Sequence, residues 1–368
     1  AHMRFLSRLA TALALVAVGA TGAAAQAASG TPLKFSGVLF LDWQNGGTKA
    51  QRAMNKFDLT RAYLNFMMPA GDNVTIRVTT DVLQNTAPGT YYAGWTARMK
   101  YAFMEWSAWK DTGKDPAALT LRFGLTQTPE IDMMESFWQR GITNTPIDYL
   151  GFVPSSDIGA VAIVTLPGKQ GQIMAGVYNG SGYGAAETNR FKDASARLSW
   201  TPLASSSDAG IFQTLAISPY YWKGYNTNAF DANAAGLQKD RWGLHVGIKD
   251  PRLTVVGEYD SRTDGTNSTT NANITTTTGA VTSAFTIVRP LAFINGTKTD
   301  PWSLVLRADQ YKPNNSVAAY QRYLIGGVGY DISSKATVYA DFQDVEGHNY
   351  TANAPDSKAF YFHFVIGF

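Results

Sequence analysis

The feature of this sequence that most constrains its fold is an alternation of apolar and polar residues, which recurs in segments of about ten residues. In the last segment an apolar residue occupies every second position: Phe360, Phe362, Phe364, Ile366 and Phe368. A period of two places successive side chains on opposite faces of a β-strand. A strand this apolar at a free sheet edge would aggregate in water, so the fold must close or cover that edge.

Sixteen segments of this kind can be delimited, and the alternation is least regular in the fourth, ninth and twelfth. About ten residues is the length that a tilted strand needs to cross a bilayer. The segments span 33–43, 56–68, 73–83, 97–109, 118–127, 157–166, 171–179, 191–200, 211–222, 240–249, 252–261, 283–294, 301–311, 319–331, 336–346 and 358–368.

The connections between these segments differ in length. Those after even-numbered segments are mostly tight turns, such as 69–72, 167–170 and 250–251, whereas those after odd-numbered segments are mostly longer. Short turns at one end and long loops at the other are typical of membrane barrels, in which closure pairs every backbone amide. We therefore predict an all-β fold, a transmembrane antiparallel up-and-down β-barrel of 16 strands whose polar face surrounds water rather than a packed core.

The N-terminal residues have the features of an exported precursor. Residues 1–2 resemble a remnant of a cloning tag, Arg4 and Arg8 precede a short apolar run, and Ala25-Gln26-Ala27 fits a signal-peptidase site. We expect residues 1–27 to be removed and 28–368 to form a single transmembrane β-barrel domain. The expected location is the outer membrane of a Gram-negative-type bacterium.

Composition excludes several classes of protein. Lys and Arg total 31 and Asp and Glu total 28; with Arg4 and Arg8 removed the balance is 31 − 2 − 28 = +1, which argues against a nucleic-acid binder. The absence of cysteine excludes a thiolate nucleophile, a Cys-ligated metal and a c-type haem, and we expect no metal and no cofactor. The abundance of aromatics, with 18 Tyr, 19 Phe and 9 Trp, favours an outer-membrane barrel.

An ordered set of short motifs resembles bacterial porins of the phosphate-selective O and P type, in the broad sense. Each motif is weak alone, and the resemblance is densest over the first half of the chain. The motifs are Phe57-Asp-Leu-Thr-Arg61-Ala62-Tyr63-Leu64, Lys100-Tyr-Ala-Phe-Met-Glu-Trp106, Thr128-Pro129, Glu135, Trp138-Gln-Arg140, Ser156-Asp157-Ile158-Gly159, Tyr178-Asn179-Gly180, Gly182-Tyr183, Lys192-Asp193 and Arg197.

This resemblance implies a 16-stranded channel, usually a homotrimer, that passes small hydrophilic solutes. Phosphate-selective members carry an arginine ladder and a lysine cluster in the pore. That ladder cannot be matched position by position here, so phosphate selectivity is not carried over. The expected function is passive diffusion of small hydrophilic solutes and ions through the outer membrane, with a mild preference for anions of the phosphate type.

Alternation also selects the residues that should face the lumen. At half height we expect a basic belt, which would favour anions, beneath outer-rim acids. The alternative is that these cations are solvated or paired with acids. The basic belt comprises Arg61, Arg77, Arg122, Arg197, His245 and Arg307, and the outer-rim acids are Asp81, Glu258, Asp260, Asp309 and Asp341.

Two long connections stand out. The segment 128–156 is long for a plain loop and contains a sequence that favours a short helix, with Pro129 in its first turn. We expect this third external loop to fold into the barrel, so that Glu130, Asp132 and Glu135 face the arginines across a constriction; the alternative is an external cap or a trimer contact. The Thr/Asn-rich segment 263–282 is expected to be a mobile external loop.

Two other functions compete with a channel. An outer-membrane hydrolase would need a nucleophile and an oriented base, but beyond the expected cleavage site the chain has only His245, His348 and His363, and no Ser/His/acid spacing recurs. A barrel scaffold could instead sheathe an electron-transfer or adhesion partner. A plugged transporter is disfavoured, because the first segment begins within about ten residues of the expected cleavage site.

The last segment has two expected roles. In a closed barrel it pairs with the first segment, its phenylalanines face lipid, and Tyr361 and His363 face the lumen. A terminal strand that ends in phenylalanine also resembles the signal read by the barrel-assembly machinery, which would be carried by Phe364, Ile366 and Phe368. The other expected partners are outer-membrane lipid and lipopolysaccharide, with no nucleic acid.

Overall fold

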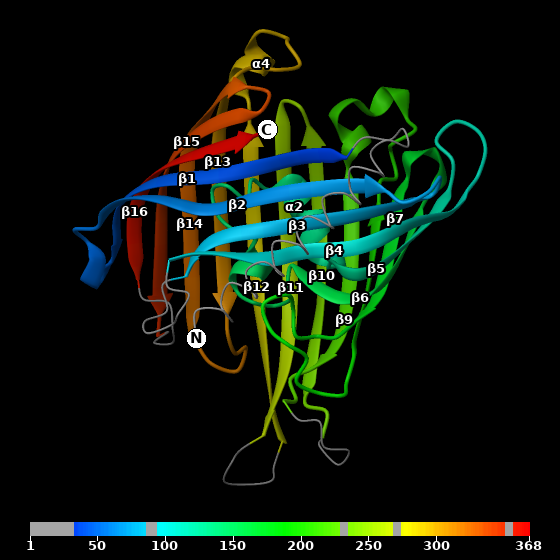
Figure 1. Cartoon of the computed structure of the whole chain (residues 1–368). Helices are drawn as coiled ribbons and strands as arrows, with labels where there is room; N and C mark the ends of the chain where they lie inside the picture. Colours follow the sequence, from blue (N-terminus) through cyan, green and yellow to red (C-terminus); the bar gives the residue numbers. More distant parts are fainter. Residues whose placement is uncertain (1–32, 86–93, 229–234, 268–273, 350–355) are drawn as a thin grey trace, which may run out of the picture.

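The computed structural model describes residues 33–85, 94–228, 235–267, 274–349 and 356–368. Within these residues the chain forms sixteen β-strands and a few short helices (Figure 1). The predicted signal segment 1–27 lies outside the described residues. The strands are β1 (Lys34–Thr48), β2 (Asn55–Pro69), β3 (Val74–Asn85), β4 (Gly94–Lys110), β5 (Ala118–Gln127), β6 (Ser156–Thr165), β7 (Gly171–Tyr178), β8 (Asp193–Trp200), β9 (Ala216–Tyr225), β10 (Gln238–Asp250), β11 (Leu253–Asn267), β12 (Ile274–Val288), β13 (Trp302–Lys312), β14 (Tyr320–Ser333), β15 (Ala336–His348) and β16 (Ser357–Gly367).

The strands form one closed, fully antiparallel barrel, as predicted. Each strand pairs with its neighbours in sequence, and β16 closes the barrel by pairing with β1. At this seam Asp42 lies opposite His363, and Gly37 and the terminal Phe368 exchange two backbone hydrogen bonds of 3.1 Å each. The apolar terminal strand is therefore paired on both edges, so it offers no free edge for aggregation.

The strands expose their apolar residues outward and bury their polar residues inward. In β10 the side chains of Trp242, Leu244 and Val246 are exposed, whereas those of Arg241 and His245 are buried. The same holds for β16, where Phe360, Phe362, Phe364 and Phe368 are exposed. An outer surface of this kind is stable against lipid hydrocarbon. None of the helices among the described residues is long and apolar enough to cross a membrane.

Two strands lie away from their predicted positions, both where the alternation was least regular. The prediction of 211–222 for the ninth strand was too early, because Ser207–Thr214 forms the 3₁₀ helix η3 with Gly210 at a φ of 56°. The prediction of 283–294 for the twelfth strand was too late, because Pro290–Ile294 forms the helix α4. Proline lacks the amide that a central strand must donate, so it ends β12.

Loop length follows parity only in part. The connections 201–215 and 289–301 follow even-numbered strands and are long, and they contain η3 and α4. The segment 263–282 is mostly not a loop: β11 and β12 continue as a paired hairpin as far as Asn267 and Ile274. In Figure 1 this hairpin extends at the end of the barrel opposite to α4. The prediction of a loop was wrong here because threonine is β-branched and favours extended pairing.

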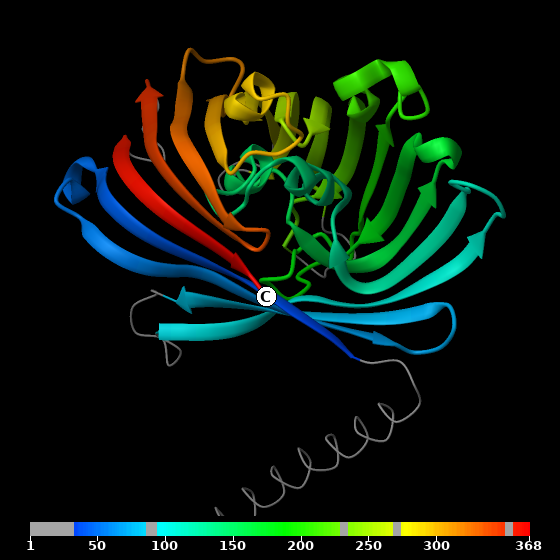
Figure 2. The same cartoon turned by 90° about the horizontal axis from the view of Figure 1, so that it is seen from above.

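The segment between β5 and β6 folds into the barrel, as predicted. It contains α2 (Pro129–Phe137) and α3 (Pro146–Tyr149). Pro129 begins α2, and Glu130 and Asp132 lie in its first turn, where carboxylates interact favourably with the helix N-terminus. Viewed along the barrel, this inner loop (residues 128–155) lies inside the ring of strands (Figure 2).

The inner loop packs as a hydrophobic core against one side of the barrel wall. Ile131, Ile147 and Phe152 contact a group of wall residues that includes Tyr178 and Trp222. A second group joins Met133, Met134, Trp138 and Ile142 to inward-facing residues that include Phe285, Val305 and Tyr323. Complete burial of a side chain of this size contributes about 1.5–3 kcal/mol. The expectation of a water-filled interior was therefore wrong for this side, because the loop supplies enough apolar surface to fill it.

Candidate functional site

The inner loop is fixed to the wall by arginines that donate hydrogen bonds to its backbone carbonyls. Arg197 on β8 donates to the carbonyl of Pro129. Arg307 on β13 donates to the carbonyl of Asn144 at 2.7 Å, and Arg241 on β10 to that of Phe152 at 2.8 Å. A hydrogen bond that involves a charged group contributes about 1.5–3 kcal/mol. These contacts hold the loop on the β8–β13 side of the barrel.

The predicted basic belt is divided by this loop. Arg197, His245 and Arg307 are only 1–2% exposed, because the inner loop covers them, so they do not contact open lumen. Arg61, Arg77 and Arg122 stand on β2, β3 and β5 and are partly exposed. Three of the six predicted cations therefore lie at the surface of the remaining lumen, and the other three are buried between the inner loop and the barrel wall.

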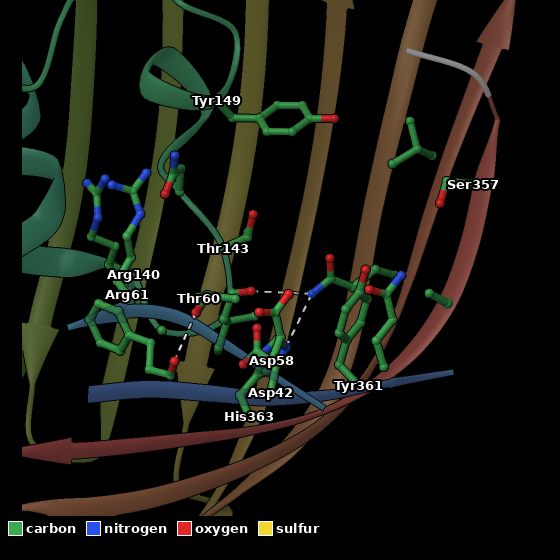
Figure 3. Close-up of a pocket in the computed structure, with 18 of the residues that line it drawn as sticks. Asp42, Asp58, Thr60, Arg61, Arg140, Thr143, Tyr149, Ser357, Tyr361 and His363 are labelled. Carbon is green, nitrogen blue, oxygen red and sulfur yellow. Dashed lines mark hydrogen bonds and ion pairs between the residues drawn. The ribbon is translucent and has the colours of Figure 1, made fainter. Parts of the chain in front are cut away.

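A cavity on the inner side of the barrel lies between the inner loop and the seam strands. Its volume is about 540 Å³ (Figure 3). The wall contributes polar residues from β1, β2, β15 and β16, and the loop contributes backbone and side chains of residues 140–144 and Tyr149. The residues that line it include Asp42, Lys56, Asp58, Thr60, Arg61, Arg140, Thr143, Asn144, Tyr149, Gln343, Ser357, Tyr361 and His363.

Charges of both signs face this cavity. In the view of Figure 3, Arg61 and Arg140 lie together on one side, and Asp42, Asp58 and His363 lie on the other. Each of the two arginines is already paired: Arg61 with Asp81 at 2.5 Å, and Arg140 with Glu135 and, at 3.0 Å, Asp148. A polar solute in this space would meet a field directed across its path.

A second, smaller cavity of about 210 Å³ lies beside β2–β4. Arg77 and Lys100 face it from the wall, and Asp132 and Glu135 face it from α2. Arg77 donates hydrogen bonds to Asn65 and Thr79, both neutral, and Lys100 donates to Ser155. No ion pair of Arg77 or Lys100 occurs within the described residues. Lys100 is only 2% exposed, so Arg77 is the partly exposed cation without a directly bonded carboxylate at this cavity.

The three acids predicted at a constriction have two different positions. Asp132 and Glu135 face the second cavity and the wall cation Arg77. Glu130 instead points into the packed side, where Ser195 donates a hydrogen bond to its carboxylate at 2.5 Å. Burial raises the pKa of Glu130 to about 7, although Ser195 and Arg197 oppose the shift. Whether these acids constrict a conducting path stays a prediction.

The predicted outer-rim acids do not form a separate layer above the basic belt. Asp309 pairs with Arg307 at 2.7 Å, Asp81 with Arg61, and Asp260 with His245 at 2.9 Å. Each acid is at most 6% exposed, including Glu258 and Asp341. Residues two apart in a strand are separated by only about 7 Å, a distance that an arginine side chain spans. The alternative of cations paired with acids therefore describes these residues, and the separation by height stays a prediction.

Several lining residues were missed from sequence. Asp42, Asp58, Arg140 and Tyr149 all face the main cavity. Asp42 alternates with Leu41 and Trp43, so the period-two pattern would have selected it. The positions of Arg140 and Tyr149 depend on how the inner loop folds, and no local sequence pattern predicts the fold of that loop.

No family model and no curated protein matches the chain, so the resemblance to phosphate-selective porins stays a prediction. Several solved structures match the chain. One is an anion-selective porin from Comamonas acidovorans, which matches with a TM-score of 0.62 and 9% identity over 92% of this chain and 99% of that one. OmpF of Salmonella typhi in complex with daunomycin matches with 0.61 and 10% identity over 91% and 97%. The outer-membrane channel DcaP of Acinetobacter baumannii matches with 0.57 and 11% identity over 91% and 97%. At these identities the likeness establishes the fold.

Proposed function

We propose that this protein is an outer-membrane porin, which forms a channel for passive diffusion of small hydrophilic solutes and ions. The observation that carries the proposal is the inner loop, which fills one side of a closed barrel and leaves a charged cavity of about 540 Å³ along the other. A structural barrel without a transport role would not need ionic groups of both signs facing unfilled space, because uncompensated buried charge is costly.

We also propose that the channel has a mild preference for anions of the phosphate type. It is supported by Arg77, which is partly exposed and whose hydrogen bonds in the described residues go to neutral partners. Most acids on the same wall are buried against cations, as Asp81 is against Arg61 and Arg98. Cations that face a narrow polar passage without their own carboxylates favour anions.

The proposed environment and partners follow from the same fold. The exposed apolar band would contact outer-membrane lipid and lipopolysaccharide, and the barrel-assembly machinery would insert the chain. A homotrimer is the proposed assembly; one structural neighbour, OmpT of Vibrio cholerae, is described in a trimer form and matches with a TM-score of 0.56 at 10% identity, over 92% of this chain and 99% of that one.

Two structural observations weigh against the alternatives. A barrel that sheathes a partner needs an empty interior, whereas the inner loop packs this one with Ile131, Met134 and Trp138. A hydrolase needs a base that contacts a nucleophile, but His245 contacts Glu258 and Asp260, and His363 contacts Asp42 and Asp341. Among the described residues the side-chain hydrogen bonds of His245, His348 and His363 go to Asp, Gln and Asn and none goes to a hydroxyl nucleophile, so we propose a channel and not an enzyme.

A liposome-swelling assay tests the proposal. Vesicles that contain the folded protein should swell in iso-osmotic solutions of small sugars, and the rate should fall steeply as the sugar grows. Vesicles that contain the heat-unfolded protein provide the control. Swelling no faster than in this control would overturn the proposal.

A further inference from the structure

The described residues contain one place where a histidine and two carboxylates converge: His245 on β10 with Glu258 and Asp260 on β11. His245 lies directly opposite Glu258 in the strand register, and Asp260 is the next inward residue along β11. The Nε2 atom of His245 is 2.9 Å from Asp260 Oδ1 and 3.4 Å from Glu258 Oε2. All three side chains are nearly completely buried, at 2–4% exposure for His245 and Glu258 and 0% for Asp260.

Hydrogen bonds satisfy this cluster only in part, since the one hydrogen bond within it joins His245 Nε2 and Asp260 Oδ1. Among the described residues neither carboxylate oxygen of Glu258 accepts a hydrogen bond, and Asp260 Oδ2 and His245 Nδ1 are also without one. A fully buried carboxylate costs several kcal/mol unless it is paired or bound to a metal. With a neutral imidazole the cluster has a formal charge of about −2, which a divalent cation would neutralise.

The distances fit a tetrahedral ion. Bonds of about 2.0–2.2 Å from zinc to nitrogen and oxygen ligands place two ligand atoms roughly 3.4 Å apart at the tetrahedral angle. The separation of 3.4 Å between His245 Nε2 and Glu258 Oε2 matches that value, and the 2.9 Å to Asp260 Oδ1 is shorter, so a small shift of the Asp260 side chain would admit an ion. One imidazole with two carboxylates is also a ligand set that zinc accepts.

A second histidine in the same barrel provides an internal comparison. His363 also contacts two carboxylates, but through opposite ring atoms: Nδ1 to Asp42 at 2.7 Å and Nε2 to Asp341 at 3.0 Å. There the two acids flank the ring and cannot converge on one point. At His245 both acids approach the same nitrogen, which is the arrangement that a metal ion needs.

The local backbone makes room for this convergence. A Cβ atom at Gly243 on β10 would collide with Asp260 Oδ1 and would lie 2.5 Å from the ring of Tyr220. Glycine weakens a strand interior, so its presence here indicates a close approach that the structure requires. Further along β10, beyond His245, the C-terminal end of α2 covers the strand. A Cβ atom at Gly247 would lie 3.0 Å from the ring of Phe137, and Lys249 donates a hydrogen bond to the carbonyl of Ser136.

We infer that His245, Glu258 and Asp260 form a binding site for a divalent transition metal ion of the zinc type, which fastens the wall beneath the inner loop. The site is enclosed between β10, β11 and α2, so its role is structural. This inference is independent of the channel proposal, because metal binding is measured without any transport.

The test uses the folded full-length barrel in detergent micelles, stripped with a chelator and dialysed. His348, which is exposed, is changed to Gln in every sample to remove a surface ligand. Calorimetric titration with ZnCl₂ should show about one ion per chain with a dissociation constant in the micromolar range or below. Co²⁺ should give the visible absorption spectrum of a tetrahedral site with mixed nitrogen and oxygen ligands.

His245→Gln and Glu258→Gln should each weaken zinc binding at least about tenfold. His363→Gln is the matched control and should leave zinc binding unchanged. If a variant does not fold, as judged by heat-modifiable migration on a gel, the Co²⁺ spectrum of the parent protein decides. The inference is overturned if the parent binds no zinc below about 100 μM, if binding survives His245→Gln, or if the Co²⁺ spectrum is octahedral.

Discussion

Arg307 on β13 donates a hydrogen bond of 2.7 Å to the carbonyl of Asn144 while it pairs with Asp309 on its own strand. One guanidinium thus joins the barrel wall to the inner loop. The Arg307 guanidinium also contacts the inner loop through Trp138, because its Cζ atom lies 4.9 Å from the centroid of the Trp138 ring. A residue that sequence placed in the open lumen instead holds the element that fills it.

Arg307→Gln should loosen the inner loop, because it removes a charged hydrogen bond and leaves Asp309 buried without its cation. The expected cost to loop docking is about 2–4 kcal/mol. Single-channel recordings should show larger or noisier conductance steps than the parent. Arg322→Gln is the matched control, since Arg322 pairs with Glu346 while 52% exposed. Unchanged, quiet steps in Arg307→Gln would contradict the anchoring role.

The double change Arg77→Gln with Arg122→Gln should lower the anion-to-cation permeability ratio, by a factor of about two or more. The reason is that both cations remain partly exposed on the lumen wall, and Arg77 has no ion pair within the described residues. The reversal potential in a salt gradient measures the ratio. Arg252→Gln, in the turn after β10, should leave it unaltered. A double variant with the parental ratio would remove the basis for anion preference.

Docking of the inner loop should weaken as pH rises between about 4.5 and 7. Burial raises the pKa of Glu130 to about 7 from a usual value near 4.5, so the docked loop favours the protonated carboxyl. The stabilisation of the docked loop by protonated Glu130 is complete below about pH 4.5, declines as the pH rises to about 7, and is lost above that pH. The free energy of docking changes by roughly 3 kcal/mol in total. Current noise recorded from pH 5 to pH 8 should increase in the parent.

Glu130→Gln keeps the shape and the hydrogen bond from Ser195 but cannot ionise. This variant should show the same current noise across the whole range. A pH dependence that persists in Glu130→Gln would assign the effect to another group.

Phe368→Asp should lower the amount of folded, inserted barrel. The Phe368 ring lies 5.7 Å from that of Phe35, and its backbone closes the seam with Gly37. A carboxylate there would face lipid at the end of the closing strand. Heat-modifiable migration of the membrane fraction measures folding, and Phe212→Asp in the connection before β9 is the control. Normal levels of folded Phe368→Asp would count against an assembly role.

The sequence predicted the barrel well because β-strands in a membrane obey one local rule, the period of two. That rule placed Phe360 and Phe362 outside and His363 inside, and it identified the closing strand. It failed near Pro290 and Gly210, where backbone restrictions override alternation. It could not show how 128–155 packs, because the contacts of Met134 with residues more than a hundred positions away are not local.

For the same reason the sequence selected lumen-facing residues but not their environment. Arg61 and Arg197 have the same alternation signal, yet one faces a cavity and the other is covered by α2. Likewise, two histidines with acidic neighbours differ in whether the acids converge or flank the ring. Such differences depend on strand register and on the inner loop together.

Planar-bilayer recording of the purified protein in a salt gradient shows whether the barrel conducts ions. A porin should give discrete, long-lived conductance steps that scale with salt concentration, and a reversal potential of the sign for mild anion preference. Steps in multiples of three per insertion would also support the trimer. A folded, inserted barrel that conducts no ions would contradict the account.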